Sequence, residues 1–297
     1  MGNKVACLTT IYPGVEDYFE EYLQGVQKQT CAGFDLVIVN DGFSLHIDRI
    51  LDRMDIKAKV FDCTLSPQAN RLYGLKMCRQ MGYDLIVCGD ADDVMSSNRV
   101  EKVITYFSEK KDSRIVYNNL VNNGFDLVYK DKITLEDILD FNVLGYSCLN
   151  IKSDLIEFIL DHQNGKIPAF DWWLGLVYLL NFKQVDFLED VSDHYRQHRD
   201  NYVGPVLDIN ESRLERGIYV KKVIYSEMID YCRRNNFTEE ENIFLQKNSE
   251  INQIESFISA NSLSTYCELV KSYFSNAPKL FWWQDIVPLS KCRKAKI

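Results

Sequence analysis

The sequence predicts an α/β protein built on a mostly parallel, mixed sheet and followed by a helical C-terminal extension. Over the first two thirds of the chain, short apolar runs typical of buried strands alternate with segments of helical periodicity. This rhythm implies parallel strands joined by helices. Beyond Gly204-Pro205 the alternation ends and long amphipathic helical patterns remain. We therefore expect two domains, residues 1–205 and 206–297.

Composition narrows the class of protein. The chain has 297 residues, of which 46% are apolar, enough for one large core and a smaller appendage. Its net charge of -9 argues against nucleic-acid binding, because a phosphate-binding surface needs a basic stripe. The nine cysteines are scattered without C-x-x-C spacing, which indicates reduced thiols. With no apolar segment typical of a signal peptide or a membrane span, we expect a cytoplasmic protein.

The first half of the chain reads as successive strand–helix units. Strands are expected at residues 5–11, 36–39, 58–61 and 85–88, and apolar helical stripes at 15–26, 47–54, 69–81 and 100–107. Ser66 and Pro67 suit the N-cap and the first position of the third helix, and Gly82 suits its end. Asn98 with Glu101 predicts a capping box for the fourth helix.

The second half has shorter connections, which suits a mixed sheet. Strands are expected near residues 115–117, 127–129 and 147–151, and helices near 135–141, 155–159 and 168–180. After residue 205, apolar positions from 214 to 232 predict one long helix, and Thr238 with Glu241 predicts a capping box for the next helix.

Three carboxylates follow the fourth expected strand at once, in Gly89-Asp90-Ala91-Asp92-Asp93. Carboxylates this close repel one another, so they stay solvated, share a proton or hold a cation. Oxygen ligands of this kind suit Mg2+ or Mn2+. The alternative is an acidic turn that caps a helix.

Other polar groups are expected at the same edge of the sheet. Thr9 or Thr10 ends the first strand and Asp41 follows the second, and ligands of open parallel sheets bind at the carboxyl ends of the strands. Arg71, in the first turn of the third helix, is free to point along this edge, and an ordinary solvated arginine is the alternative. Asp171 heads an apolar helix, where a plain N-cap is the alternative role.

Six segments in order, between about residue 4 and residue 205, give the chain a family resemblance. It resembles the inverting family 2 glycosyltransferases of the GT-A fold, rhamnosyltransferase-like members in particular. The segments are Thr9-Thr10-Ile11-Tyr12, Gln29-Thr30, Val39-Asn40-Asp41-Gly42, the DxD-like Gly89 to Asp93, Phe170-Asp171-Trp172-Trp173, and Tyr195-Arg196-Gln197-His198 with Asn201 and Gly204. Phe170 and Asn40 depart from the family pattern, since acidic residues are frequent at both positions.

The resemblance implies a Rossmann-like GT-A catalytic domain and an enzyme that moves a sugar from a nucleotide diphosphate, a UDP- or dTDP-sugar, to a glycan or lipid-linked acceptor. It assigns Thr10, Tyr12 and Asp41 to the nucleotide and Asp90 to the ribose or the sugar. Asp92, assisted by Asp90 or Asp93, would hold Mn2+ or Mg2+. Arg71 and His198 would bind the diphosphate. Asp171 would be the general base.

Two other functions remain open on the sequence. A sugar-nucleotide nucleotidyltransferase uses a similar sheet, although its Gly-rich phosphate loop has only Gly14 as a counterpart here. A nucleotide-binding module without turnover is the second alternative.

The C-terminus combines an aromatic cluster with a basic tail. Leu280-Phe281-Trp282-Trp283 precedes Lys291, Arg293, Lys294 and Lys296. Such a segment can lie on an anionic membrane surface, or its aromatic side chains can dock on the body of the protein. Peripheral contact with the inner face of the membrane is therefore one expectation.

Overall fold

The computed structural model describes residues 3–122, 125–127, 132–162, 166–196, 209–275 and 281–294. The chain divides into two compact units. The first, here called the sheet unit, comprises residues 1–134, 144–166 and 182–201. The second, the helical unit, comprises residues 135–143, 167–181 and 202–297.

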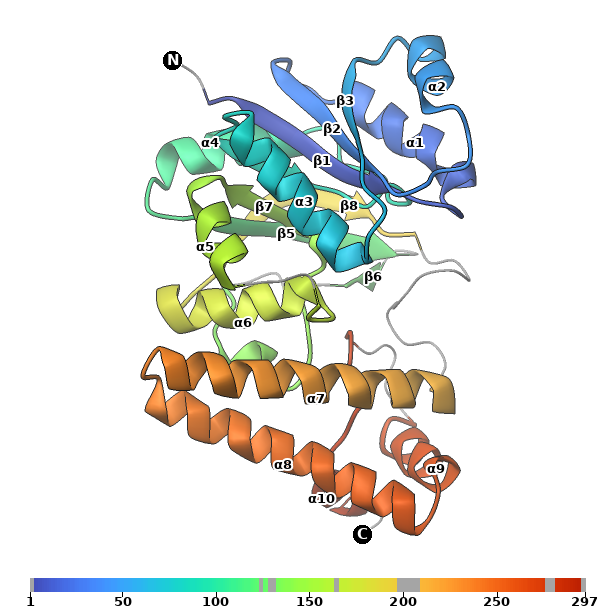
Figure 1. Ribbon diagram of the computed structural model, residues 1–297, viewed down its shortest axis with the longest axis vertical. Helices are drawn as coiled ribbons and strands as arrows, with labels where there is room; N and C mark the ends of the chain where they lie inside the picture. The colour runs from blue at the N-terminus through green and yellow to red at the C-terminus, as the bar shows by residue number, and fades with distance from the viewer. Residues whose placement is uncertain are drawn as a thin grey trace. The chain divides into compact units, whose positions relative to one another are not determined.

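The sheet unit is built on one eight-stranded mixed sheet (Figure 1). Its strands are β1 (Val5–Ile11), β2 (Phe34–Asn40), β3 (Ala58–Asp62), β4 (Leu85–Cys88), β5 (Ile115–Asn122), β6 (Phe125–Asp126), β7 (Leu149–Lys152) and β8 (Asp186–His194). The order is β3-β2-β1-β4-β7-β5-β6, with β8 beside β5. Strands β1 to β4 are parallel, as the alternation predicts, and β7 enters antiparallel between β4 and β5. The predicted α/β fold with a mixed sheet is confirmed.

Helices cover both faces of this sheet. They are α1 (Glu16–Gln27), α2 (Ile47–Arg53), α3 (Pro67–Gln80), α4 (Arg99–Glu109) and α5 (Asp154–His162). Figure 1 shows α3 lying across one face. Its predicted start is confirmed, because the Ser66 hydroxyl accepts a hydrogen bond from the backbone N–H of Ala69 at 3.3 Å. Gly82 follows the helix with a φ of +72°, a conformation that favours glycine.

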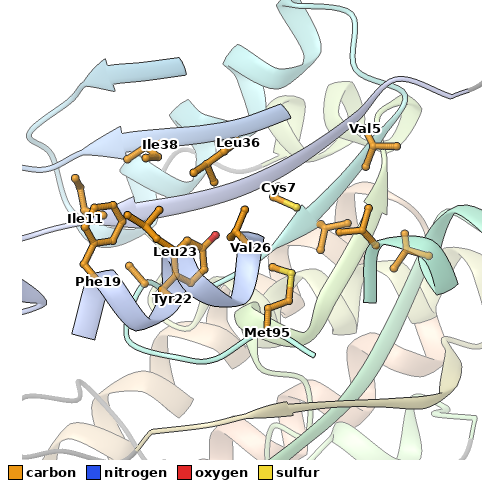
Figure 2. Packing of buried hydrophobic residues seen from close by; sticks show 14 of the residues in the cluster. Val5, Cys7, Ile11, Phe19, Tyr22, Leu23, Val26, Leu36, Ile38 and Met95 are labelled. Carbon is orange, nitrogen blue, oxygen red and sulfur yellow. The ribbon is translucent and has the colours of Figure 1, made fainter. Parts of the chain in front are cut away.

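An apolar core lies between the sheet and helices α1 and α4. Figure 2 shows Phe19, Tyr22 and Leu23 of α1 near Ile11 of β1, with Cys7 and Val5 farther along the strand in the same cluster. Val5 and Cys7 point to one face because strand side chains alternate. The helical periodicity of α1 and the two-residue period of β1 therefore meet in one apolar layer.

The capping box predicted at Asn98 and Glu101 is wrong. Asn98 is the N-cap residue of α4, but its amide donates to the carbonyl of Asp190, at 2.9 Å. The N–H of Val100 is instead satisfied by Gln29, whose side-chain oxygen accepts it at 3.0 Å. A residue distant in sequence thus replaces the local cap, which a local pattern cannot reveal.

Two other elements differ from the expectation. Instead of a helix at 135–141, the chain forms a single 3₁₀ turn, Glu136–Ile138. Strand β8 was not predicted. The strand expected near 127–129 lies partly outside the described residues, and β6 is observed at Phe125–Asp126.

The helical unit contains α6 (Phe170–Phe182), α7 (Glu211–Arg234), α8 (Thr238–Ala260), α9 (Leu263–Tyr273) and α10 (Leu289–Lys294). Helices α7 and α8 lie side by side (Figure 1). The long helix predicted from residue 214 to 232 is confirmed as α7. The capping box at Thr238 is wrong, because Thr238 is the first helical residue and Glu241 pairs with Arg233 at 2.9 Å.

The boundary between the two units is not the single division at residue 205 that the sequence predicts. Segment 167–181, which contains most of α6, clusters with the C-terminal helices. Helix α6 is apolar on all sides and is buried from Phe170 to Leu180 except at Asp171, so it needs neighbours around its whole circumference. Within the helical unit, the indole of Trp172 packs edge-on against the ring of Tyr225 and donates to the carbonyl of Ile138 at 2.8 Å.

The aromatic cluster near the C-terminus is packed within the helical unit. Trp282 and Trp283 are buried, and the carbonyl of Trp282 accepts a hydrogen bond from the N–H of Asn142 at 3.0 Å. None of the helices in the described ranges combines the length and the hydropathy needed to cross a membrane. All nine cysteines are thiols, and seven of them are buried.

Candidate active site

Three parallel strands bring most of the predicted site residues of the sheet unit to one edge. In the register, Ile11 of β1 stands opposite Asn40 of β2, and Leu8 stands opposite Cys88 of β4. The segments that follow these strands therefore leave the sheet side by side. Thr10 lies half-buried at this edge.

Asp41 is held at the start of its turn by a backbone hydrogen bond. Its N–H donates to the carbonyl of Ile11 at 2.8 Å. Burial raises the pKa of the Asp41 carboxyl, and a hydrogen bond with the side chain of Asn70 opposes that shift. Asn70 is fully buried near the start of α3. Asn70 was not among the predicted site residues, although a polar side chain beside the apolar stripe of α3 is a usable signal.

Arg71 and Asp90 form an ion pair, with 3.0 Å between Nη2 and Oδ1. Both side chains are partly open, 24% and 30% exposed. The guanidinium of Arg71 also stacks 4.1 Å from the ring centre of Tyr146. Burial raises the pKa of Asp90, and the charge of Arg71 opposes this. Arg71 is thus a fixed cation at the strand ends rather than a solvated surface residue.

Asp92 lies next to Tyr12. The phenol of Tyr12 donates to Oδ2 of Asp92 over a long 3.5 Å. Burial, followed by the charges of Asp92 and Asp90, raises the pKa of Tyr12. The phenol therefore stays protonated and acts as a neutral donor at neutral pH.

Asp93 points into the protein and bonds to the chain after β8. Its Oδ1 accepts from the backbone N–H of Arg196 at 2.9 Å. The carboxyl is 5% exposed, and burial together with the charges of Asp92 and Asp90 raises its pKa well above the usual range. This geometry suits a structural role for Asp93 better than that of a metal ligand.

The carboxylates fit a divalent cation only in part. Among the described residues, no group of three or more acidic, histidine or cysteine side chains is arranged to hold a metal ion. Asp92 and Asp90 offer oxygen ligands at the strand ends, while Asp93 is engaged with Arg196. Mg2+ is commonly bound by one or two carboxylates with substrate phosphates completing its shell, so this pair fits a cation that arrives with a diphosphate.

The predicted general base belongs to the helical unit. Asp171 lies in the first turn of α6, where Oδ2 accepts from Asn142 Nδ2 at 3.1 Å and Oδ1 from the N–H of Trp172 at 3.0 Å. Asn142 is buried and was not predicted as a site residue. His198 lies outside the described residues.

The model of the family described as glycosyl transferase family 2 matches residues 8–166, which is more than half of the chain. A curated Escherichia coli relative, UDP-Gal:alpha-D-GlcNAc-diphosphoundecaprenol beta-1,3-galactosyltransferase, is 26% identical over 121 residues. That match covers 38% of this chain, and the chain spans 42% of the length of that relative.

Solved structures with similar folds include proteins from Staphylococcus aureus and from Pyrobaculum calidifontis. Staphylococcus aureus TarS 1–349 has a TM-score of 0.61 at 17% identity and is matched over 91% of this chain and 79% of that one. TarS 1–349 in complex with UDP has a TM-score of 0.57 at 19% identity, over 76% and 65%. The P. calidifontis mannosyltransferase PcManGT, in complex with GDP-Man and Mn2+, has a TM-score of 0.58 at 10% identity, over 100% and 86%.

These likenesses show the fold, and it is the GT-A-like fold expected from the motifs. The family follows from the sequence model, which includes the Asp41 turn, Arg71 and the three aspartates that meet at the sheet edge. The chain therefore belongs to glycosyl transferase family 2.

Proposed function

We propose that this chain transfers a sugar from a nucleotide diphosphate to an acceptor hydroxyl, with inversion at the anomeric carbon. One observation carries the proposal within the family. Asp41, the ion pair of Arg71 with Asp90, and the contact of Asp92 with Tyr12 all lie at the carboxyl-end edge of β1, β2 and β4. An acidic and cationic cluster at such an edge suits a nucleotide diphosphate.

The donor's nucleoside is assigned to the β1 and β2 side of this edge. Thr10, Tyr12 and Asp41 would bind the base and its surroundings, and Asp90 would bind the ribose or the sugar. A UDP- or dTDP-sugar is the proposed donor. Support comes from the TarS complexes with UDP and UDP-GlcNAc, while PcManGT binds GDP-Man, so a donor panel must include guanine nucleotides.

The diphosphate is assigned to Arg71 and, from the sequence, His198. Arginine binds phosphate through paired N–H groups, and Arg71 is already held in place by Tyr146. Asp92, with Asp90, would hold Mn2+ or Mg2+, and Asp93 is the weakest of the three candidate ligands. A bound cation would neutralise the charge that grows on the departing diphosphate. The Mn2+ in the PcManGT complex supports this assignment.

Asp171 is the proposed general base. Its carboxylate takes the proton of the acceptor hydroxyl while that oxygen forms its bond to the anomeric carbon. The bond from this carbon to the diphosphate oxygen breaks, and the diphosphate leaves with the electron pair. The bonds from Asn142 and Trp172 to its two oxygens hold the carboxylate in one orientation.

The acceptor is proposed to be a glycan or a lipid-linked saccharide. The name of the E. coli relative includes a diphosphoundecaprenol-linked sugar, which supports a lipid-linked acceptor. We place the enzyme in the cytoplasm, at the inner face of the membrane. Because Trp282 and Trp283 are buried, the basic residues that follow them are the proposed membrane contact.

Donor hydrolysis tests the proposal. UDP-, dTDP- and GDP-sugars are incubated with the chain and Mn2+, with and without a chelator, and free sugar is measured. Slow, chelator-sensitive sugar release is the expected result, and it should be lost in Asp92→Asn but kept in Asp48→Asn, an exposed carboxylate of α2. Pyrophosphate-driven exchange would instead indicate a nucleotidyltransferase, and tight binding without release a binding module.

A further inference from the structure

A buried ion pair adjoins the candidate active site, and sequence reasoning missed both of its members. Arg99, at the start of α4, and Asp193, in β8, are 1% and 2% exposed, with 2.6 Å between Nη1 and Oδ2. With Asp90 and Asp93 they line one small cavity. The segment 89–96 that carries the three aspartates is called the acidic loop below.

Arg99 is bonded to β7 and to the turn before it. Its Nη1 donates to the carbonyl of Ser147 at 2.6 Å, and its Nη2 donates to the carbonyl of Leu149 at 3.1 Å. Nε and Nη2 both donate to Oδ1 of Asn150, at 3.1 and 3.0 Å. With so many bonds to the interior of the sheet, the guanidinium is a fixed counter-charge for Asp193.

Asp193 joins that fixed charge to the acidic loop. Its Oδ1 accepts from the backbone N–H of Ser96 at 2.7 Å, and its Oδ2 also accepts from Asn118 Nδ2 at 2.9 Å. Both carboxylate oxygens of Asp193 lie in the protein interior, where charge-assisted hydrogen bonds are strong.

The chain after Asp193 makes three more hydrogen bonds to the same loop. Val94 and His194 exchange backbone hydrogen bonds of 3.0 and 2.9 Å, and the N–H of Arg196 donates to Asp93 at 2.9 Å. Loop residues 93, 94 and 96 are therefore all attached to β8 or to the residues directly after it. Asp90 and Asp92 lie on the length of loop immediately before these attachments.

A bulge in β8 precedes this attachment. The register against β5 shifts between Asn118 and Asn119, whose partners are Leu188 and Ser192. Asp190 lies within the shift with a φ of +61°, and its carbonyl accepts the bond from Asn98. Bulges of this kind re-aim side chains near active sites.

We propose that Asp193, fixed by Arg99, is a positioning residue that sets where the acidic loop holds Asp90 and Asp92. This inference rests on the proposed function, because it concerns the same donor site. Residues that orient metal ligands from outside commonly change metal affinity or activity 10- to 100-fold when they are mutated. Asp193 and Arg99 would act in this way without touching the donor.

The test removes the pair without leaving a buried charge. In Arg99→Met with Asp193→Leu, apolar side chains replace both charges, so neither is left buried without its partner. Thermal unfolding checks the fold, and calorimetry measures UDP binding in the presence of Mn2+. We expect a lower melting temperature, because the carbonyls of Ser147 and Leu149 and the amide of Asn150 lose the hydrogen bonds of Arg99, and UDP affinity weakened about 10- to 100-fold in the folded variant. Parent-like affinity in the folded double variant would overturn the proposal.

A second ion pair provides a matched control. Arg213 and Asp285, in the helical unit, lie 2.5 Å apart with side chains 17% and 0% exposed. Arg213→Met with Asp285→Leu removes the same chemical groups elsewhere, and UDP affinity should stay at the parent value. An equal loss in both double variants would mean that any buried pair has this effect, and would contradict a positioning role for Asp193.

Hydrogen exchange on the parent chain gives a result even where the double variant does not fold. The amides of Val94, Ser96 and Arg196 should exchange slowly if the loop is attached to β8, and exchange as rapid as in an exposed loop would refute the attachment. This measurement needs no nucleotide. If the parent binds neither UDP, dTDP nor GDP while these amides are protected, the proposed function fails and the attachment stands.

Discussion

Arg71 pairs with Asp90, a carboxylate that is also assigned to the proposed donor site. Replacing Arg71 by alanine removes the cation assigned to the diphosphate, and hydrogen bonds to charged groups typically contribute about 1.5–3 kcal/mol. We expect UDP affinity to fall about 10- to 100-fold, while uridine, which has no phosphate, loses far less. Competition binding of the two ligands measures this difference.

The control for Arg71 is on the same helix. Arg79 pairs with Glu157, and their side chains are 41% and 67% exposed. Arg79→Ala should leave the affinities for UDP and uridine unchanged. Equal losses for UDP and uridine in Arg71→Ala would place Arg71 away from the diphosphate.

Asp171 should affect the transfer step and not donor binding. Asp171→Asn keeps an oxygen that can accept from the N–H of Trp172, so the start of α6 should remain folded. Loss of a general base commonly lowers the rate about two to four orders of magnitude. Transfer rate and UDP affinity are compared with those of Asp230→Asn, an exposed carboxylate of α7. Transfer at the parent rate in Asp171→Asn would exclude it as the base.

Residue by residue, the sequence predicted polar groups at strand ends but not their partners. Asp41, Asp90 and Asp92 were readable because each follows an apolar strand. Asp193 was not, because its role depends on bonds to residues distant in sequence. Asp93 was predicted as a metal ligand for the same reason, because its bond to Arg196 spans 103 positions and no local pattern reveals it.

At the scale of elements, the parallel strands were predictable and β8 was not. Strands β1, β2 and β4 are short apolar runs, which is the pattern typical of buried parallel strands. Strand β8 reads Asp-Phe-Leu-Glu-Asp-Val-Ser-Asp-His, and its bulge near Asp190 interrupts the two-residue period. Its burial follows from pairing with β5, which no pattern within nine residues can show.

The contact of α3 with the sheet gives a prediction about stability. A Cβ added to Gly74 would lie 2.8 Å from Leu8 Cδ1 and 3.0 Å from Val39 Cγ2. Because these atoms belong to a packed layer, Gly74→Ala should lower the free energy of unfolding by about 1–3 kcal/mol despite the better helix propensity of alanine. Denaturant unfolding measures the change, with Lys76→Ala at an exposed position of α3 as the control. A Gly74→Ala variant as stable as the parent would mean that Leu8 and Val39 move aside for the added methyl group with no loss of stability.

For the whole molecule, the alternation of strands and helices was enough to predict the sheet unit. It did not predict which segments of the chain belong to each unit. Each strand–helix unit of the first hundred residues carries its own periodicity, so the parallel half needed no distant information. The apolar pattern of α6 predicted full burial. Its neighbours are distant in sequence, such as Ile138 and Tyr225 beside Trp172, so the division at residue 205 missed the segments 135–143 and 167–181.

Because of Lys221, we expect the free energy of unfolding to depend on pH in the alkaline range. It is buried in α7 and donates to the carbonyl of Ile286 at 2.9 Å. Burial lowers its pKa from 10.5 to about 8, although the charges of Asp140 and Asp285 oppose this. Between pH 8 and 10.5 the unfolded chain therefore binds more protons than the folded chain, and this residue's contribution to stability rises with pH.

Comparison with Lys221→Met isolates that contribution, because the tyrosines and cysteines that titrate in the same range are common to both chains. A pKa lowered from 10.5 to about 8 corresponds to a penalty of about 3 kcal/mol when the ammonium is charged. Lys221→Met should thus gain stability relative to the parent at pH 7, and the gap should close as the pH rises from 8 to 10.5. Urea unfolding across this range measures it. A constant gap would mean that Lys221 keeps its ordinary pKa in the folded chain, held by Asp140 and Asp285 more strongly than burial opposes it.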